Sequence, residues 1–428
     1  MTDVAVAQPD GWSLKTWLRT SSVPYLAMTV VAILAARYTS YLFREDIQIK
    51  GQPLYIAVEL IIFPLAVLLW LYYRGKRTTS RWLTVFLVAM LVAWAVRLGL
   101  MVIHGDLFNH LAWLTPVFLI MLLLKTPPWQ DAWTAVVVLA GGLAVILVSA
   151  YLLEVTGLIE PLYLPAGITE FQQKEYWLPL DGFLGVDGRW TGPFGHNTRA
   201  GFAAALIFVI GFAQWRRSSI PLVVIGTFFL LITSVRASYL AAFTGVLILI
   251  LFSRWRGLAR VPLWARWAAL GLFACVATYG FTMTGAGLTG RQSIWPAFWA
   301  LYPDSPIIGV GRQGIMAAGG LTAVREDAHN ILLDELVRFG IIGFVVMIGA
   351  LLIGLIISFR AAARGFAAGA AVVVAYLVTS MTDIQNDWIQ LYYHSFLILM
   401  AVTAAGAWVE ARKTERLNEV QSSDEAVT

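Results

Sequence analysis

The stretch WLTVFLVAMLVAWAVRLGLMVI, residues 82–103, contains 22 residues and one charged side chain, Arg97. A helix rises about 1.5 Å per residue, so a segment of this length covers the roughly 30 Å hydrocarbon core of a bilayer. The sequence RGKRTTSR, with four basic residues, precedes it at 74–81. Because loops rich in Lys and Arg stay on the cytoplasmic side, the stretch predicts a membrane-spanning helix that runs outward from the cytoplasm.

The whole chain is also rich in apolar residues and poor in charged ones. Of its 428 residues, 59% are hydrophobic and 13% are charged, whereas soluble domains average about 25% charged residues. A soluble globular protein is therefore excluded. The net charge of +5 does not indicate a nucleic-acid partner, because most basic residues lie between apolar runs and report orientation in the membrane. The single cysteine, Cys275, excludes an intramolecular disulfide and a cysteine-based zinc site.

The apolar runs predict an all-α, polytopic membrane protein that forms a single membrane domain over residues 1–428. We expect about twelve spans, at 23–43, 54–73, 82–103, 109–124, 131–153, 200–215, 219–235, 238–253, 262–283, 341–359, 365–382 and 388–409.

Charge distribution predicts the orientation. With a cytoplasmic N-terminus, 18 of the 30 basic residues fall on the cytoplasmic side and 11 on the outer side. The positive-inside rule therefore predicts that both termini are cytoplasmic. Residues 411–428 are polar and without periodicity, and we expect them to form a cytoplasmic tail.

Two outer segments are long, 154–199 and 284–340, whereas the cytoplasmic loops are short. Both segments contain aromatic residues, Pro and Gly, which suits half-buried interfacial structure. Function is therefore expected on the outer face. A GxxxxGK[ST] run and a GxSxG run are both missing from the sequence, which argues against ATP-driven chemistry and against a serine hydrolase.

The outer segment 284–340 ends in the most informative motif, AHNILLDELVRFGIIGF at 328–344. His329 and Asn330 precede a helical pattern that ends at Gly340, and Asp334 and Arg338 are spaced to pair one turn apart. A histidine at a helix start can accept a proton near neutral pH, as a general base must. The alternative is a capping or interfacial histidine without chemistry.

Three outer arginines lie at the ends of spans: Arg199 in FGHNTRAGF, Arg236 in TSVRASYL and Arg291 in TGRQSIWPAFW. Arginine rarely lies beside long apolar runs without a partner, and its guanidinium suits the oxygens of phosphate. An anionic ligand is therefore expected here. The alternative for each is that its side chain extends to the lipid headgroups.

Acidic residues give weaker signals. Glu45 and Asp46 could hold Mg²⁺ or Mn²⁺ in a metal-dependent sugar transferase, although adjacent acids in a loop are more often only solvated. Asp383 and Asp387, also on the outer side, could orient His329 or balance an arginine. We expect no metal site.

Together, the outer His, the outer Arg residues and the spans resemble the O-antigen ligase family, within the superfamily of O-antigen ligases, O-antigen polymerases and O-oligosaccharyltransferases. The most specific match is His-Asn, nine residues, then Gly-x-x-Gly, here His329, Asn330, Gly340 and Gly343. RQSIWPAFWALYPDSPIIGVGRQGI resembles the family stretch of Arg, Trp, a Pro-bearing turn and Gly-x-Gly. TSVRASYLA resembles its Ser-x-Ser-Arg element, with Val235 in place of a common serine.

The resemblance implies a metal-independent, cofactor-free membrane glycosyltransferase of the bacterial inner membrane with a periplasmic active site. It implies transfer of O-antigen polysaccharide from undecaprenyl pyrophosphate to a sugar hydroxyl of lipid A-core. His329 would be the general base, and Arg236 and Arg291, with Arg199, would bind pyrophosphate. Asn330 is expected to contribute to substrate binding.

Three other functions remain open at this stage. An O-antigen polymerase or a protein O-oligosaccharyltransferase would use the same chemistry on another acceptor, which the outer segment 154–199 could select. Twelve spans with both termini inside also fit a lipid or polysaccharide transporter, but transporters usually carry charges near the bilayer midplane. Here charged residues within the predicted spans are few, Arg97 being the clearest. This scarcity favours an enzyme over a transporter. The sequence identifies neither the glycan, nor the acceptor, nor the oligomeric state.

Overall fold

The structure of the chain is a computed structural model. It describes residues 80–106, 114–158, 163–164, 189–190, 192–194, 197–214, 217–233, 235–252, 291–318, 328, 330–381 and 393–425, with the isolated positions 64, 67, 68, 262 and 264.

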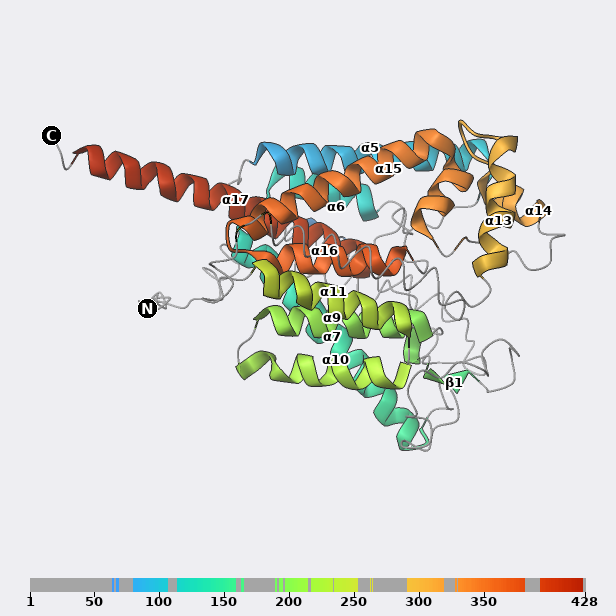
Figure 1. Cartoon of the computed structure of the whole chain (residues 1–428), viewed down its shortest axis with the longest axis horizontal. Coiled ribbons are helices and arrows are strands. Elements are labelled where there is room, and N and C mark those ends of the chain that lie inside the picture. The colour runs from blue at the N-terminus through green and yellow to red at the C-terminus, as the bar shows by residue number, and fades with distance from the viewer. Residues whose placement is uncertain are drawn as a thin grey trace.

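Helices make up almost all of the described structure (Figure 1). Its first half contains α5 (Arg81–Ile103), α6 (Leu114–Leu124), α7 (Trp129–Val155), β1 (Tyr163–Leu164), β2 (Arg189–Trp190), η3 (Gly192–Phe194), α9 (Asn197–Gln214), η4 (Arg217–Ser219), α10 (Ile220–Thr233) and α11 (Arg236–Phe252). Its second half contains α13 (Arg291–Leu301), η6 (Tyr302–Asp304), α14 (Gly311–Ala318), α15 (Ile331–Ala363), α16 (Ala367–Ser380) and α17 (Tyr393–Glu425). The two strands pair antiparallel, Tyr163 opposite Trp190.

Four of these helices are long and apolar enough to cross a membrane: α5, α7, α15 and the part His394–Ser422 of α17. Five shorter apolar helices, α6, α9, α10, α11 and α16, lie where the sequence predicts further spans. The expected all-helical, multi-pass class is therefore confirmed. The expected spans at 23–43, 54–73 and 262–283 fall outside the described residues, apart from isolated positions, so the count of twelve stays a prediction.

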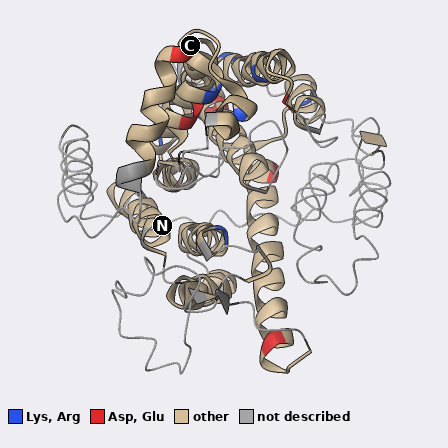
Figure 2. Ribbon diagram, turned by 90° about the vertical axis from the view of Figure 1, so that its right-hand side faces the viewer, with Lys and Arg blue, Asp and Glu red and all other residues tan. Residues whose placement is uncertain are grey.

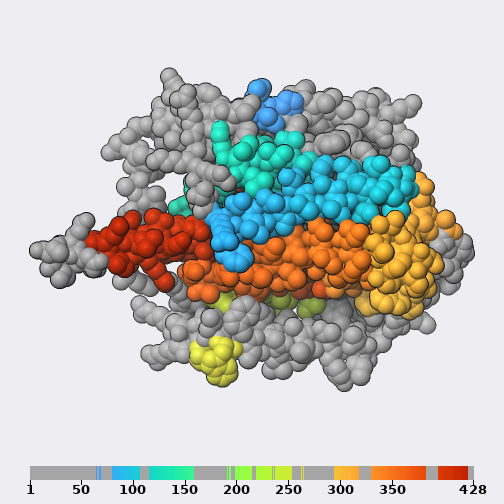
Figure 3. Space-filling model, turned by 90° about the horizontal axis from the view of Figure 1, so that it is seen from above, coloured from blue at the N-terminus to red at the C-terminus, as the bar shows by residue number. Residues whose placement is uncertain are grey.

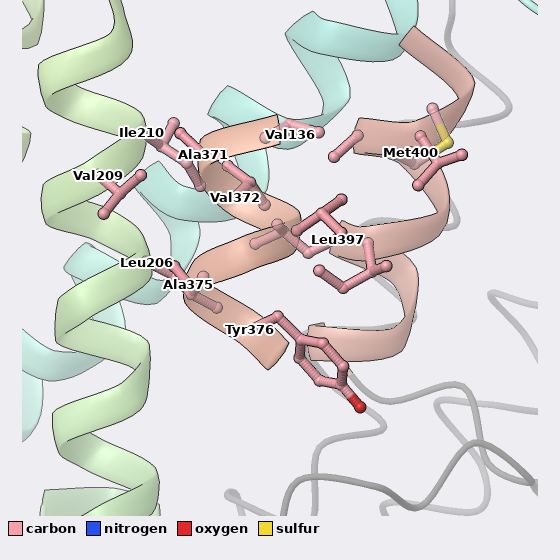
Figure 4. Close-up of a cluster of buried hydrophobic side chains, with 14 of the residues drawn as sticks. Val136, Leu206, Val209, Ile210, Ala371, Val372, Ala375, Tyr376, Leu397 and Met400 are labelled. Atoms are coloured by element: carbon pink, nitrogen blue, oxygen red, sulfur yellow. The ribbon is translucent and has the colours of Figure 1, made fainter. Parts of the chain in front are cut away.

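The core forms around α16, which packs between α9 and α11 on one side and α17 on the other. Figure 4 shows Ala371 and Ala375 of α16 toward Leu206 and Ile210 of α9, with Leu397 of α17 on the side of α16 away from α9. Small residues allow this close approach: a Cβ on Gly369 would lie 3.1 Å from the carbonyl oxygen of Ala401. Close backbone packing of this kind is the main source of helix association in a bilayer.

A second layer consists of α5 and α15, which lie side by side (Figure 3). Ser80 caps the start of α5, where its hydroxyl accepts a hydrogen bond from the amide of Leu83 at 3.4 Å. At the same end of the pair, α15 turns into α16 through Gly365, whose φ of 98° suits glycine. Charged positions are few along the described helices (Figure 2), as expected for helices that face lipid.

The segments that the sequence assigns to the outer side gather at one end of the helices, which we call the α13 end. There α13 and α14 lie beside the end of α5 and the start of α15, and β1 lies near α10 at the same end (Figure 1). The described parts of segment 154–199 are anchored there: the indole of Trp190 donates to Glu154 Oε2 at 2.7 Å and is buried against Phe229.

At the opposite end, residues 411–425 of the expected polar tail continue α17 as a helix that projects from the body (Figure 1). Arg412 and Glu415 form an exposed ion pair one turn apart, at 2.6 Å, and such pairs stabilise an exposed helix.

Candidate active site

The helix that follows His329 is short, with its own N-cap and with a break between it and the rest of α15. Asn330 is its N-cap, and its side-chain oxygen accepts hydrogen bonds from the amides of Leu332 and Leu333 at 2.9 and 3.2 Å. The helix breaks at Gly340, where φ is 64° and ψ is −170°. Residues 331–339, which we call the motif helix, are therefore distinct from the membrane-spanning part of α15. The predicted helix start and the predicted stop at Gly340 are both confirmed.

Both chain neighbours of His329 are held in place. The amide of the buried Ala328 donates to Asp334 Oδ1 at 3.4 Å, and its carbonyl accepts from the Trp295 indole at 3.0 Å. Asp334 also pairs with Arg338 at 3.6 Å, as the spacing predicts. On the other side of His329 stands the cap residue Asn330. His329 itself lies outside the described residues, so its role stays a prediction.

The break at Gly340 brings a second backbone segment into contact with the motif helix. The amide of Val310 donates to Val337 O at 2.9 Å, and the amide of Ile341 donates to Pro306 O at 2.9 Å. A Cβ on Gly340 would lie 2.3 Å from the Ile307 carbonyl oxygen. Gly309, with φ of 78°, approaches the motif helix as closely. The turn 306–310 therefore satisfies backbone groups that the break exposes, and two glycine motifs of the sequence meet here.

The end of α5 holds this turn and α14. The His104 Nε2–H donates to Ile308 O at 3.0 Å. The carboxylate of Asp106 accepts from the first amides of α14, those of Arg312 at 2.9 Å and Gln313 at 3.1 Å. A carboxylate at a helix N-terminus binds orphan amides and matches the positive end of the helix dipole. Hydrogen bonds thus join α5, the turn 306–310, α14 and the motif helix to one another at the α13 end.

A buried ion pair joins α5 to the motif helix. Arg97 Nη2 lies 3.1 Å from Glu335 Oε1, and the two side chains are 3% and 0% exposed. The Arg97 guanidinium also lies 4.6 Å from the centre of the Phe339 ring. Arg97, which the sequence places in mid-span, is therefore bound to the motif helix.

An apolar groove of about 760 Å³ lies between α13 and the motif helix. Its polar lining residue is Asn330, and the others are apolar: Trp295, Pro296, Trp299, Leu332, Leu333, Leu336 and Phe344. The groove thus includes Asn330, the residue after His329 in the sequence, and suits a hydrocarbon chain better than a sugar, which would require polar partners.

The three expected arginines are all at helix starts. Arg236 and Arg291 are the first residues of α11 and α13, and their side chains lie outside what the structure describes. Arg199 is exposed in the first turn of α9 and interacts electrostatically with His394. Two of the three helix starts are adjacent, because a Cβ on Gly201 would lie 3.1 Å from Val235 Cβ. Arg291 lies one turn before Trp295, whose indole donates to the carbonyl of Ala328.

The expected acids Glu45, Asp46, Asp383 and Asp387 lie outside the described residues.

Residues 221–348 match the family model described as O-antigen ligase. Over these residues the chain is similar to the O-antigen ligase family. The O-antigen ligase segment contains Arg236, Arg291, His329 and Asn330 and ends just beyond Gly343, whereas Arg199 precedes it. Members of this family are glycosyltransferase-like enzymes. No curated protein matches the chain.

Three features of the O-antigen ligase segment and its surroundings were not predicted: Glu335 as the partner of Arg97, the Asp106 cap of α14, and the indole bond from Trp295 to Ala328. One signal was available for the first. A charged residue within a span requires a partner, and Glu335 stands in an otherwise apolar part of the motif.

Proposed function

We propose that the chain is an O-antigen ligase that transfers O-antigen polysaccharide from undecaprenyl pyrophosphate to a sugar hydroxyl of lipid A-core at the periplasmic face of the bacterial inner membrane. The observation that carries the proposal is the family match over 221–348, which contains the His-Asn pair and two of the three arginines. The hydrogen bonds that fix Ala328 and Asn330 support it, because a general base must be held in position.

In the proposed reaction the His329 imidazole removes the proton of the acceptor hydroxyl while its oxygen attacks the anomeric carbon of the donor sugar. The bond from that carbon to the carrier phosphate breaks, and undecaprenyl pyrophosphate leaves. Direct displacement inverts the anomeric configuration. Arg236, Arg291 and Arg199 stabilise the negative charge that grows on pyrophosphate, since fixed cations act strongly in a half-dry site.

Two parts of the chain serve the substrates in this proposal. The apolar groove beside Asn330 has the volume and lining for part of the carrier's hydrocarbon chain. The segment 154–199 is the candidate for choosing the acceptor. Because pyrophosphate is an activated leaving group, neither ATP nor a metal is required, and transfer should persist in EDTA. Activity that disappears in EDTA and returns with Mg²⁺ or Mn²⁺ would redirect attention to Glu45 and Asp46.

The test is transfer by the purified protein with lipid-linked donor and lipid A-core acceptor. His329→Ala should lower the rate about 10²- to 10⁴-fold, and Arg236→Ala or Arg291→Ala about 10²- to 10³-fold. Arg416→Ala, which removes an exposed cation on the projecting part of α17, is the matched control and should leave the rate unchanged. Near-normal transfer by His329→Ala would refute the assignment of the base.

Cells lacking the protein distinguish the related functions. A ligase predicts that polymer is lost from lipid A-core while long carrier-linked polymer accumulates. A single repeat unit still attached to the core would instead indicate a polymerase, and unchanged lipopolysaccharide with loss of glycan from proteins would indicate an O-oligosaccharyltransferase.

A further inference from the structure

The buried ion pair between Arg97 and Glu335 has no direct role in the proposed reaction. Its atoms are 3.1 Å apart, and both side chains are almost fully buried. The pair joins the first described helix of the chain to the helix that starts beside His329.

Arg97 lies in the last third of α5, 16 residues from its start at Arg81. Glu335 precedes the break at Gly340, so it belongs to the motif helix rather than to the span that follows. The pair therefore lies near the end of α5 that adjoins the proposed site.

Stability does not account for such a pair. Removing two ions from water is costly, and well-packed apolar residues of similar volume are often equally stabilising or better. In some proteins, buried polar or ionic groups instead select one geometry among several. The geometry here is specific, because Arg97 contacts Glu335 and also the ring of Phe339 one turn later.

These contacts constrain the motif helix in two ways. Glu335 and Phe339 stand four residues apart and so lie on one face of the helix. Because the Arg97 guanidinium contacts both Glu335 and Phe339, it turns this face of the motif helix toward α5. The same contacts fix the position of the motif helix along the axis of α5. The adjoining, groove-lining face carries Leu332, Leu333 and Leu336, which apolar contact alone would hold less specifically, because apolar contact is non-directional.

We propose that Arg97 and Glu335 are a positioning pair that sets the rotation and height of the motif helix and thereby places His329 where it takes the proton of the acceptor hydroxyl. The proposal rests on the proposed function for the role of His329. The pair touches neither substrate; it acts through the backbone of residues 331–339.

The deciding variant replaces both partners by apolar residues, Arg97→Met with Glu335→Met, which should fold because no uncompensated charge remains. We expect kcat to fall about 10²-fold, since a misplacement of about 1 Å has that effect, while the KM for the donor changes little. Hydrogen exchange should become faster at residues 328–339 and stay unchanged in α16. The reciprocal exchange, Arg97→Glu with Glu335→Arg, should recover part of kcat. The double variant Arg412→Gln with Glu415→Gln, which removes an exposed ion pair, is the matched control.

A double-methionine variant with wild-type kcat would overturn the proposal, whether or not exchange at 328–339 changes. A parallel fall in protection throughout the chain would overturn it too, because the pair would then be a general structural contact. If the wild-type protein itself shows no transfer, the proposed function fails instead, and the exchange data still decide whether the pair orders the motif helix.

Discussion

Gly340 has a backbone conformation that is essentially restricted to glycine, with φ of 64° and ψ of −170°. We expect Gly340→Ala to destabilise the α13 end by more than about 1–2 kcal/mol, because a left-handed conformation alone has that cost and the new Cβ would meet the Ile307 carbonyl. Gly349→Ala in the same helix is the control. Nothing lies within 4 Å of its added Cβ, so it should keep or raise the Tm, since alanine favours helix. Thermal unfolding of both variants checks this; equal Tm values would contradict it.

Asn330 allows its two roles, capping and substrate binding, to be separated. Asn330→Ala removes the acceptor for two helix amides and should lower stability by about 0.5–2 kcal/mol. Asn330→Asp keeps an oxygen in that position and should retain the Tm. If Asn330→Asp is stable yet slow in transfer, its amide serves the substrate as the sequence predicts. If Asn330→Asp is as unstable as Asn330→Ala, the capping explanation is wrong.

Single residues show where prediction from sequence succeeds. The helix stop at Gly340 and the pair Asp334–Arg338 follow from local spacing, and both are confirmed. The bond between His104 and Ile308 joins residues 204 positions apart, and no local pattern reports it. The sequence thus predicts the motif helix but not what holds it.

At the scale of elements, α14 depends on α5. Asp106→Ala should free the first amides of α14, with a loss of about 0.5–2 kcal/mol and faster hydrogen exchange at 311–318. Asp106→Asn keeps an acceptor oxygen and should lose less. Asp304→Ala, an exposed acid in the neighbouring η6, is the control. Unchanged exchange in α14 of Asp106→Ala would show that the cap is not what holds this helix.

Hydropathy predicts the apolar helices well, because an apolar segment in lipid must satisfy its own backbone hydrogen bonds and therefore forms a helix. It fails for residues 411–425, which are polar on all sides and have no apolar stripe. Ion pairs such as Arg412–Glu415 and continuity with the buried part of α17 support that helix instead. An exposed helix of this kind leaves little hydrophobic periodicity to detect.

The whole molecule has two chemically different ends. The α13 end holds the motif helix, α13 and α14, and the opposite end carries the projecting part of α17 with Arg412, Lys413 and Arg416 (Figures 1 and 3). The positive-inside rule assigns the basic end to the cytoplasm, which would leave the α13 end facing the periplasm. The donor and acceptor of the proposed reaction require this arrangement.

Single cysteines test the orientation directly, because Cys275 is the only natural one. In a Cys275→Ser background, Ala317→Cys on α14 and Glu419→Cys on α17 are both exposed positions. A membrane-impermeant thiol reagent should label Ala317→Cys in cells whose outer membrane alone has been opened, and Glu419→Cys only after the inner membrane is opened, since the reagent cannot cross the hydrocarbon core. The Cys275→Ser parent should remain unlabelled throughout. The reverse pattern would put the motif helix in the cytoplasm, where lipid A-core attached to the periplasmic leaflet could not reach it, and the proposed ligase reaction would be wrong.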